Sequence, residues 1–187
     1  MRTLSVFNQV SLDGFIADAH GDMSWAHRDD PQWRKFVAGN AKGKVAFLFG
    51  RRTWQMMAGH WSSSQAHADV PSVAEAMCAA PKYVFSRSLE RADWENSTLL
   101  RSALVPAVRK LKAQRGPDLL ILGSASLVGQ LTEAGLIDQW QVVVCPIVLG
   151  AGRPLFDGLR RRTVLRLVGS RSFRDGNVVL RYERAGR

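Results

Sequence analysis

Apolar and polar positions along the chain follow two patterns that alternate. Short apolar runs rich in β-branched and aromatic residues, as in buried strands, cover residues 3–10, 44–50, 82–89, 118–123 and 140–150. Between these runs, apolar residues recur at helical spacing, which predicts helices that begin at residues 31, 51, 71, 106 and 124. Strands that alternate with helices are typical of a mostly parallel sheet covered by helices on both faces.

The last part of the chain follows a different pattern. Two strand-like runs, residues 163–173 and 177–184, are joined across Asp175 and Gly176, a pair that favours a hairpin turn. We therefore expect an α/β fold with a mostly parallel central sheet, flanking helices and an antiparallel C-terminal hairpin. The 187 residues suit one domain spanning positions 1–187.

Composition places the chain among ordinary globular proteins, with 46% hydrophobic and 22% charged residues. No apolar run has the roughly 18 residues of a membrane span, and the first residues lack the apolar core of a signal peptide. We therefore expect a cytoplasmic protein with no membrane partner. Cys78 and Cys145 form neither a disulfide framework nor a metal-ligand pattern, so no metal is expected.

Positive charge is concentrated near the C-terminal end. The chain carries a formal charge of +10, and residues 151–187 contain ten arginines against three acidic residues. Such a segment suits anionic partners, either phosphorylated small molecules or nucleic acid, and an Arg-rich solvated surface is the alternative. It contains no aromatic stacking platform and no nucleic-acid motif. We expect no nucleic-acid partner and keep a basic nucleic-acid-binding module at residues 151–187 as the second hypothesis.

Three predicted strands end in small or hydroxyl residues, and two of these ends add arginine. Helix N-termini at such junctions bind anions, and glycine lets the backbone approach a phosphate. Three anion sites on one sheet edge suit a dinucleotide with a third phosphate, hence NADPH rather than NADH. No GxGxxG or Walker pattern is present. The residues concerned are Gly50, Arg51, Arg52 and Thr53, then Ser86 and Arg87, then Gly123, Ser124, Ala125, Ser126 and Leu127.

Six stretches carry a family resemblance and span nearly the whole chain. They are VSLDGFIA (10–17), GDMSW (21–25), LFGRRTW (48–54), VFSRSL (84–89), LILGSASLVGQL (120–131) and AGLIDQWQVVVCPIVLGAGRPLF (134–156). In these stretches the chain resembles the dihydrofolate reductase-like family. It is most similar to the branch related to the C-terminal reductase domain of the bifunctional riboflavin-biosynthesis deaminase/reductase. The resemblance implies an NADPH-dependent reductase that forms a homodimer through the C-terminal part of the sheet.

The resemblance also assigns roles to the cofactor residues. Residues 50–53 and 123–127 would hold the NADPH phosphates, and Ser86 and Arg87 would face the 2′-phosphate and adenosine. The loop between Val10 and Trp25 resembles a mobile loop that closes over the nicotinamide. In that loop Ile16 and Ala17 would lie beside the ring, and Gly21 would allow the loop to turn.

The substrate side is expected to contain Asp13, Trp25, Asp30 and Trp33. The spacing of Asp30 from the two tryptophans is similar to that of the pterin-binding acid in dihydrofolate reductases, which makes Asp30 the candidate catalytic acid. Asp30 before Pro31 is also what a helix N-cap looks like, which is the favoured interpretation, and Asp13 before Gly14 could be structural in the same way. Loop histidines are further candidate proton donors, namely His20, His27, His60 and His67.

The substrate class follows from the resemblance and from one departure. Residues after Asp30 do not repeat the set that dihydrofolate reductases place around the folate tail. We therefore expect hydride transfer to a small heterocyclic substrate, pterin- or pyrimidine-like, or to a carbonyl substrate. A protein that binds NADPH without catalysis is the third hypothesis.

Overall fold

The central feature of the computed structural model is a twisted sheet, built within the described residues 1–26, 30–41 and 44–185. Eight of the strands in these residues form this sheet, in the order β5-β4-β3-β6-β1-β7-β10-β9. Their bounds are β1 (Leu4–Ser11), β3 (Val45–Gly50), β4 (Lys82–Phe85), β5 (Ser97–Leu100), β6 (Asp118–Leu122), β7 (Gln139–Cys145), β9 (Leu165–Ser172) and β10 (Val178–Arg184).

The strand directions confirm the predicted architecture. The strands from β5 to β7 in this order are parallel, whereas β10 is antiparallel to β7 and β9 is antiparallel to β10. In the middle of the sheet Val6 of β1 pairs with Ile121 of β6 on one side and with Trp140 of β7 on the other. The strand β6 therefore separates β1 from β3, although β3 comes earlier in the chain.

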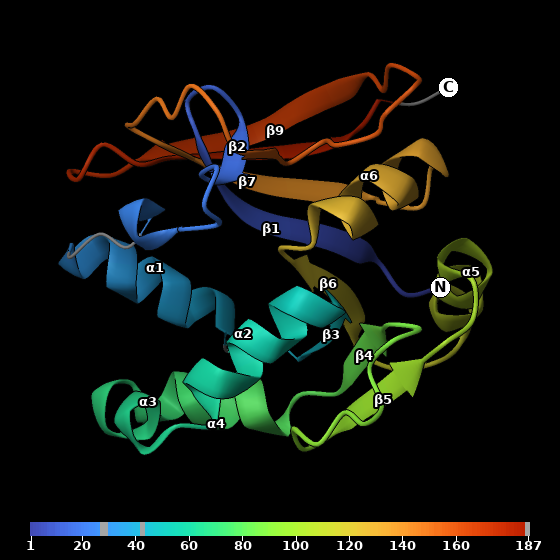
Figure 1. Ribbon diagram of the computed structural model, residues 1–187. Helices are drawn as coiled ribbons and strands as arrows, with labels where there is room; N and C mark the ends of the chain where they lie inside the picture. The colour runs from blue at the N-terminus through green and yellow to red at the C-terminus, as the bar shows by residue number, and fades with distance from the viewer. Residues whose placement is uncertain (27–29, 42–43, 186–187) are drawn as a thin grey trace.

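Helices cover both faces of the sheet (Figure 1). The helices α5 (Leu104–Ala113) and α6 (Ala125–Glu133) pack on one face through a buried cluster that includes Val108, Leu111 and Leu131. On the other face, Trp54 and Met77 belong to the cluster under α2 and α4, and α1 packs on a third cluster. The bounds of these helices are α1 (Pro31–Ala41), α2 (Arg51–Trp61), α3 (Ser64–Asp69) and α4 (Pro71–Ala79).

Two predicted strands end earlier than their apolar pattern indicates. The strand predicted to residue 89 ends at Phe85, because the Ser86 hydroxyl accepts the amide of Leu89 (2.9 Å) and forms a turn. The strand predicted to residue 150 ends at Cys145, because Pro146 has no amide hydrogen for a ladder. Both shortened ends leave loops at the carboxyl edge of the sheet.

Several short elements were not predicted. The strands β2 (Phe15–Ala17) and β8 (Arg153–Pro154) pair with each other in a separate small sheet, and β5 and α3 were also missed. A 3-10 turn, η1 (Ser24–Ala26), interrupts the predicted loop. These elements are too short for a periodic pattern to identify them.

Among the described helices, none combines the length and the apolar character needed to cross a bilayer. The assignment of residues 1–187 to one domain stays a prediction.

Candidate active site

Two of the three predicted anion sites, at residues 50–53 and at residues 123–127, lie next to each other at the carboxyl edge of the sheet, because β3 and β6 are neighbours. We call residues 50–53 the β3–α2 corner and residues 123–127 the β6–α6 corner. The chain passes from β1 to β3 and later returns to place β6 between them. Ligands of open α/β sheets bind at such positions, where the strand order reverses.

Two hydrogen bonds join these corners. The amide of Gly50 donates to the hydroxyl oxygen of Ser124 (2.8 Å), and the Ser124 hydroxyl donates to Thr53 Oγ1 (2.8 Å). Ser124 is buried, with 8% of its surface exposed. Ser124 was predicted among the residues that hold the cofactor phosphates, and this stays a prediction; in the structure its hydroxyl holds the two corners together. The hydroxyl hydrogen of Thr53 is not needed for these bonds and can serve a ligand.

The glycines of the two corners make this approach possible. A Cβ atom added at Gly50 would lie 3.1 Å from Ser124 Oγ. At Gly123 it would lie 3.1 Å from Thr53 Cγ2, and Gly123 has a φ of +70° that residues with side chains rarely adopt. At Gly50 and Gly123 no side chain therefore covers the backbone at the edge of the sheet, as close contact with a phosphate requires.

Two helix N-termini meet at this edge. The carbonyl of Ser124 accepts the amides of Leu127 (2.8 Å) and Val128 (3.1 Å), so the amides of Ala125 and Ser126 have no partner within α6. Ala125 and Leu127 have buried side chains and can offer a ligand only their backbone. The positive ends of α2 and α6 therefore both favour an anion here.

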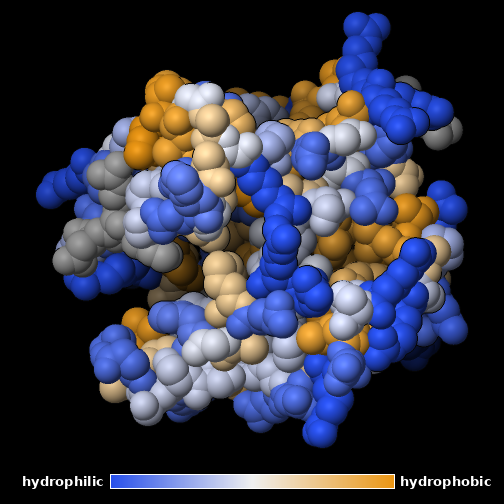
Figure 2. Space-filling view, in the orientation of Figure 1, coloured by the Kyte–Doolittle hydropathy of each residue, from blue (hydrophilic) through white to orange (hydrophobic). Residues whose placement is uncertain are grey.

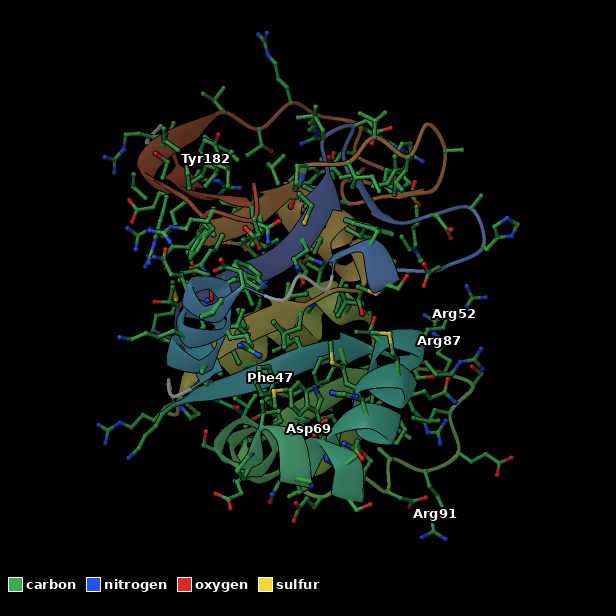
Figure 3. The ribbon with its side chains drawn as sticks, turned by 90° about the vertical axis from the view of Figure 1, so that its left-hand side faces the viewer. Phe47, Arg52, Asp69, Arg87, Arg91 and Tyr182 are labelled. Carbon is green, nitrogen blue, oxygen red and sulfur yellow. The ribbon has the colours of Figure 1, made fainter. Side chains whose placement is uncertain are left out.

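The third anion site is a turn at residues 86–90, which follows β4. The guanidinium of Arg51 reaches across from the β3–α2 corner and donates to Ser88 Oγ (2.9 Å). Figure 3 shows Arg52 and Arg87 at one edge of the molecule. Among the described residues, neither of these two exposed guanidiniums forms a hydrogen bond or ion pair. The structure thus brings all three predicted sites together and leaves Arg52 and Arg87 available for an anion.

The loop between β1 and β2 is fixed by Asp13. The Asp13 carboxylate accepts the amides of Leu149 (3.2 Å) and Gly150 (2.7 Å), which belong to the loop after β7. A hydrogen bond from the Ser11 hydroxyl, helped by these two amides, lowers the pKa of Asp13 below its ordinary value of 3.8. Both carboxylate oxygens of Asp13 therefore bind the protein itself, which favours the structural interpretation of this residue.

The residues predicted to lie beside the nicotinamide are ordered as well. Val10 is buried near the end of β1, and Ile16 and Ala17 are buried in β2. Gly21 has a φ of +87°, and its amide donates to the carbonyl of Asp18 (3.1 Å). The Asp18 carboxylate accepts the amide of Asp22 (2.8 Å). The turn at Gly21 predicted from the sequence is therefore present.

Asp30 caps the helix α1. Its carboxylate Oδ1 accepts the amide of Trp33 (2.7 Å), and its carbonyl accepts the amide of Arg34 (2.9 Å). Trp33 is 5% exposed and stacks on Phe36, with ring centroids 5.5 Å apart, so its ring is part of the core. Trp25 is half-buried and donates from Nε1 to the carbonyl of Asp22 (3.1 Å). The roles of Asp30, Trp33 and Trp25 toward a substrate stay predictions.

A hollow lies on the same side of the molecule as α1. Figure 2 shows it at the left of this face, between the upper part, where the β1–β2 loop lies in Figure 1, and the lower part with α2 and α3. Hydrophilic side chains run down the middle of the face, and on the right they surround a hydrophobic area.

The three candidate histidines in the described residues show no catalytic arrangement. His20 is exposed in its loop, His60 packs edge-on against Trp61, and His67 Nδ1 lies 2.9 Å from the carbonyl oxygen of Ser63. His27 falls outside the described residues. Within the described part of the chain, no group of three or more His, Cys, Asp or Glu residues could hold a metal ion.

The family follows from a comparison with protein-family models. The model of the RibD C-terminal domain matches residues 2–179. The chain belongs to the RibD C-terminal domain family. This membership confirms the resemblance found in the six sequence stretches and places the protein in a family of reductase type.

The chain is also similar to a curated protein and to solved structures. The uncharacterized protein YyaP of Bacillus subtilis (strain 168) is 29% identical over 174 residues, covering 92% of this chain and 90% of YyaP. A putative riboflavin biosynthesis protein from Shewanella sp. PV-4 has a TM-score of 0.77 and 25% identity, with full coverage of both chains. A dihydrofolate reductase from Enterococcus faecalis complexed with NADP(H) has a TM-score of 0.67 and 14% identity, covering 98% and 97%. The dihydrofolate reductase-like fold is therefore confirmed.

This member of the family has two residues near the site that the sequence analysis missed. Asn8 is buried on β1, and with its amide oxygen turned toward the β6–α6 corner it accepts the amide of Gly123 (3.3 Å). The sequence pattern could have identified Asn8, because it is the polar residue on a strand face otherwise made of Leu4, Val6 and Val10. Arg101 contacts the 86–90 turn, and nothing in its local sequence indicates this.

Proposed function

We propose that this RibD C-terminal domain protein is an NADPH-dependent reductase of a small heterocyclic, pterin- or pyrimidine-like, or carbonyl substrate. The expected compartment is the cytoplasm. The observation that carries the proposal is the linkage of the three anion sites, through Gly50, Ser124 and Thr53 and through Arg51 and Ser88. When bound, NADPH supplies a hydride, and the protein binds, orients and shields the reactants.

The cofactor phosphates fit the two glycine corners. Exposed amides at the starts of α2 and α6 and the hydroxyl of Thr53 would donate to the diphosphate, and Gly50 and Gly123 leave room for it. Ser126 at the first turn of α6 would add a second hydroxyl. Backbone donors favour anions without reading the base, so these corners alone do not distinguish NADPH from NADH.

The choice of NADPH is proposed to rest on Arg52, Arg87 and Ser86. Two guanidiniums at one edge of the molecule, which have no partner among the described residues, match the geometry of a phosphate, which accepts forked donors. Arg51 is already bonded to Ser88, so its first role is to hold the turn. The Enterococcus faecalis dihydrofolate reductase, whose structure holds NADP(H), supports a nicotinamide cofactor.

The nicotinamide end is proposed to lie under the β1–β2 loop. Ile16 and Ala17 would exclude water from the ring, which a hydride transfer requires. Asp13 fixes this loop to residues 149 and 150. Asp30, at the start of α1, is the proposed source of the proton, which its carboxyl group would donate in the protonated form; the same group caps the helix.

The contacts of residues 151–187 favour the reductase over a nucleic-acid-binding module. Several of their arginines already bind partners within the protein. Arg161 pairs with Glu133 (3.6 Å), Arg166 with Glu183 (2.9 Å), Arg184 donates to the carbonyl of Gly135 (2.9 Å), and Arg171 lies over the Phe173 ring (4.6 Å). The arginines that make these contacts are distributed over the hairpin and its neighbours, and they do not form one continuous strip of unpaired positive charge.

Ligand binding tests the proposal first. We expect NADPH to raise the melting temperature more than NADH, and a random oligonucleotide to have little effect at physiological salt. Arg87→Ala should weaken NADPH binding by about tenfold or more, the loss of one charge-assisted contact, and leave NADH unchanged. No response to either dinucleotide would contradict the proposal.

Turnover distinguishes the reductase from a protein that only binds NADPH. Loss of reduced-nicotinamide absorbance would be followed with dihydrofolate, the ribosylamino-pyrimidine of riboflavin synthesis, and a panel of ketones and quinones. Tight NADPH binding without oxidation by any of these compounds would favour the non-catalytic alternative.

A further inference from the structure

Arg101 lies beside the turn that is proposed to read the 2′-phosphate. It directly follows β5, and Leu100 of that strand pairs with Phe85 at the end of β4. Because β4 and β5 are parallel, Arg101 and the 86–90 turn leave the sheet at the same edge. Neither β4 nor β5 extends far enough to hold residues 87–90 by ladder hydrogen bonds.

The guanidinium of Arg101 holds two points of this turn. Its Nη1 donates to the carbonyl of Arg87 (3.1 Å), and its Nη2 donates to the carbonyl of Glu90 (3.1 Å). The Ser86 hydroxyl accepts the amide of Leu89 from inside the turn, and Arg51 holds Ser88 from the opposite corner. The backbone that carries Arg87 is therefore fixed mainly by side chains.

We infer that Arg101 is a positioning residue for cofactor choice, which holds the 86–90 turn so that Ser86 and Arg87 face the 2′-phosphate. The inference rests on the proposed function. A turn that is already ordered loses less conformational entropy when the ligand binds, so affinity for the group it reads is higher. Since NADH lacks the 2′-phosphate, Arg101 contributes to NADPH binding and not to NADH binding.

The geometry requires an arginine at this position. A planar guanidinium presents two donors in a fixed fork and can serve two carbonyls at once, whereas the ammonium of lysine is a point charge on a flexible stem. Arg101→Lys keeps the charge and loses the fork. It therefore separates positioning from a simple electrostatic attraction of the phosphate.

The first test measures dissociation constants for NADPH and NADH in Arg101→Ala, Arg101→Lys and a control. Arg91→Ala is the matched control, because Arg91 is an exposed arginine paired with Asp93 (3.0 Å) and lies away from Arg87 in Figure 3. We expect both Arg101 variants to weaken NADPH by about tenfold with NADH unchanged, and the control to behave as the wild type. An equal loss for both dinucleotides, or a wild-type affinity in Arg101→Lys, would overturn the inference.

The second test needs no cofactor. Hydrogen exchange of the Ser88 and Leu89 amides should become faster in Arg101→Ala and stay unchanged in Arg91→Ala, since only the first variant releases the turn. Unchanged exchange in Arg101→Ala overturns the positioning role whatever the protein binds. A wild-type protein that does not bind NADPH would instead contradict the proposed function, so the two failures are distinguishable.

Discussion

At the scale of one residue, Ser124 combines a strained backbone conformation with hydrogen bonds to two other residues. Its φ of +61° and ψ of +69° lie in the left-handed region, which costs a residue with a side chain about 1 kcal/mol or more. The conformation directs the hydroxyl back to Gly50 and Thr53 instead of capping α6. Strain at this point is offset by hydrogen bonds, and it leaves the first amides of the helix open to an anion.

Replacing Ser124 tests this arrangement. Ser124→Ala leaves the partly buried Gly50 amide without an acceptor, so we expect a loss of about 1–3 kcal/mol in the free energy of unfolding, together with weaker NADPH binding. Urea denaturation and calorimetric titration measure the two effects. Ser126→Ala is the control, because Ser126 is exposed and should change stability by about 0.5 kcal/mol or less. Equal stability of the two variants would refute the linking role of Ser124.

Asp30 can be tested for its two roles separately. Asparagine caps helices about as well as aspartate, so Asp30→Asn should keep the melting temperature and lose turnover if the carboxyl group supplies the proton. Asp30→Ala should lose both, with a stability cost of about 1 kcal/mol. Thermal melts and steady-state rates measure this. A fully active Asp30→Asn variant would leave Asp30 with the helix cap alone.

At the scale of elements, the loops matter more than the strands that carry them. The loop after β1 and the loop after β7 are separated by most of the chain, yet Asp13 and the β2–β8 pair hold them together. Gly152 allows this contact, since a Cβ atom there would lie 2.2 Å from the carbonyl oxygen of Ala17. The wall proposed to face the nicotinamide is thus built from both loops.

The link made by Asp13 should depend on pH. Because the folded-state pKa lies below the ordinary 3.8, the ionised carboxylate stabilises the loop above that value. This stabilisation is lost as the pH falls through the lower, folded-state pKa. An NMR titration of the Gly150 amide should show a midpoint below 3.8 in the wild type and none in Asp13→Asn. A midpoint at or above 3.8 would argue against the contact.

The sequence predicted these elements to different extents, for physical reasons. Long apolar runs such as residues 44–50 and 118–123 predicted their strands because burial on both faces requires such runs. Glycine and arginine after a strand indicated the anion sites, but not that Ser124 would bind Gly50 and Thr53 across the sheet. The contacts of Arg101 depend on the pairing of β5 with β4, which four residues of pattern could not predict.

At the scale of the whole molecule, the sheet ends in an exposed apolar edge. The strand β9 has no neighbour on its outer side among the described strands. It carries Leu167 at 52% and Val168 at 43% exposure, and Val164 just before it is 66% exposed. Natural proteins usually protect such edges, by charge or by pairing. We propose that this edge and the face beside it form the homodimer expected from the family resemblance.

A single substitution tests the dimer. Leu167→Asp places a charge in the proposed interface, so we expect a wild-type dimer and a monomeric variant in light scattering coupled to size exclusion. Because Leu167 is half exposed in one chain, the substitution should change the free energy of unfolding of the monomer by about 0.5 kcal/mol or less. A monomeric wild type would contradict the proposal.

The insertion of β6 between β1 and β3 has a consequence for the growing chain on the ribosome. The hydrogen bond from Gly50 to Ser124 joins residues 74 positions apart, so the β3–α2 corner cannot form it until most of the chain has been synthesised. Until then, β1 and β3 each expose an unpaired edge at which nascent chains can aggregate. A stalled or truncated chain that lacks β6 cannot complete the proposed phosphate site, so affinity for the dinucleotide should appear only after synthesis has passed α6.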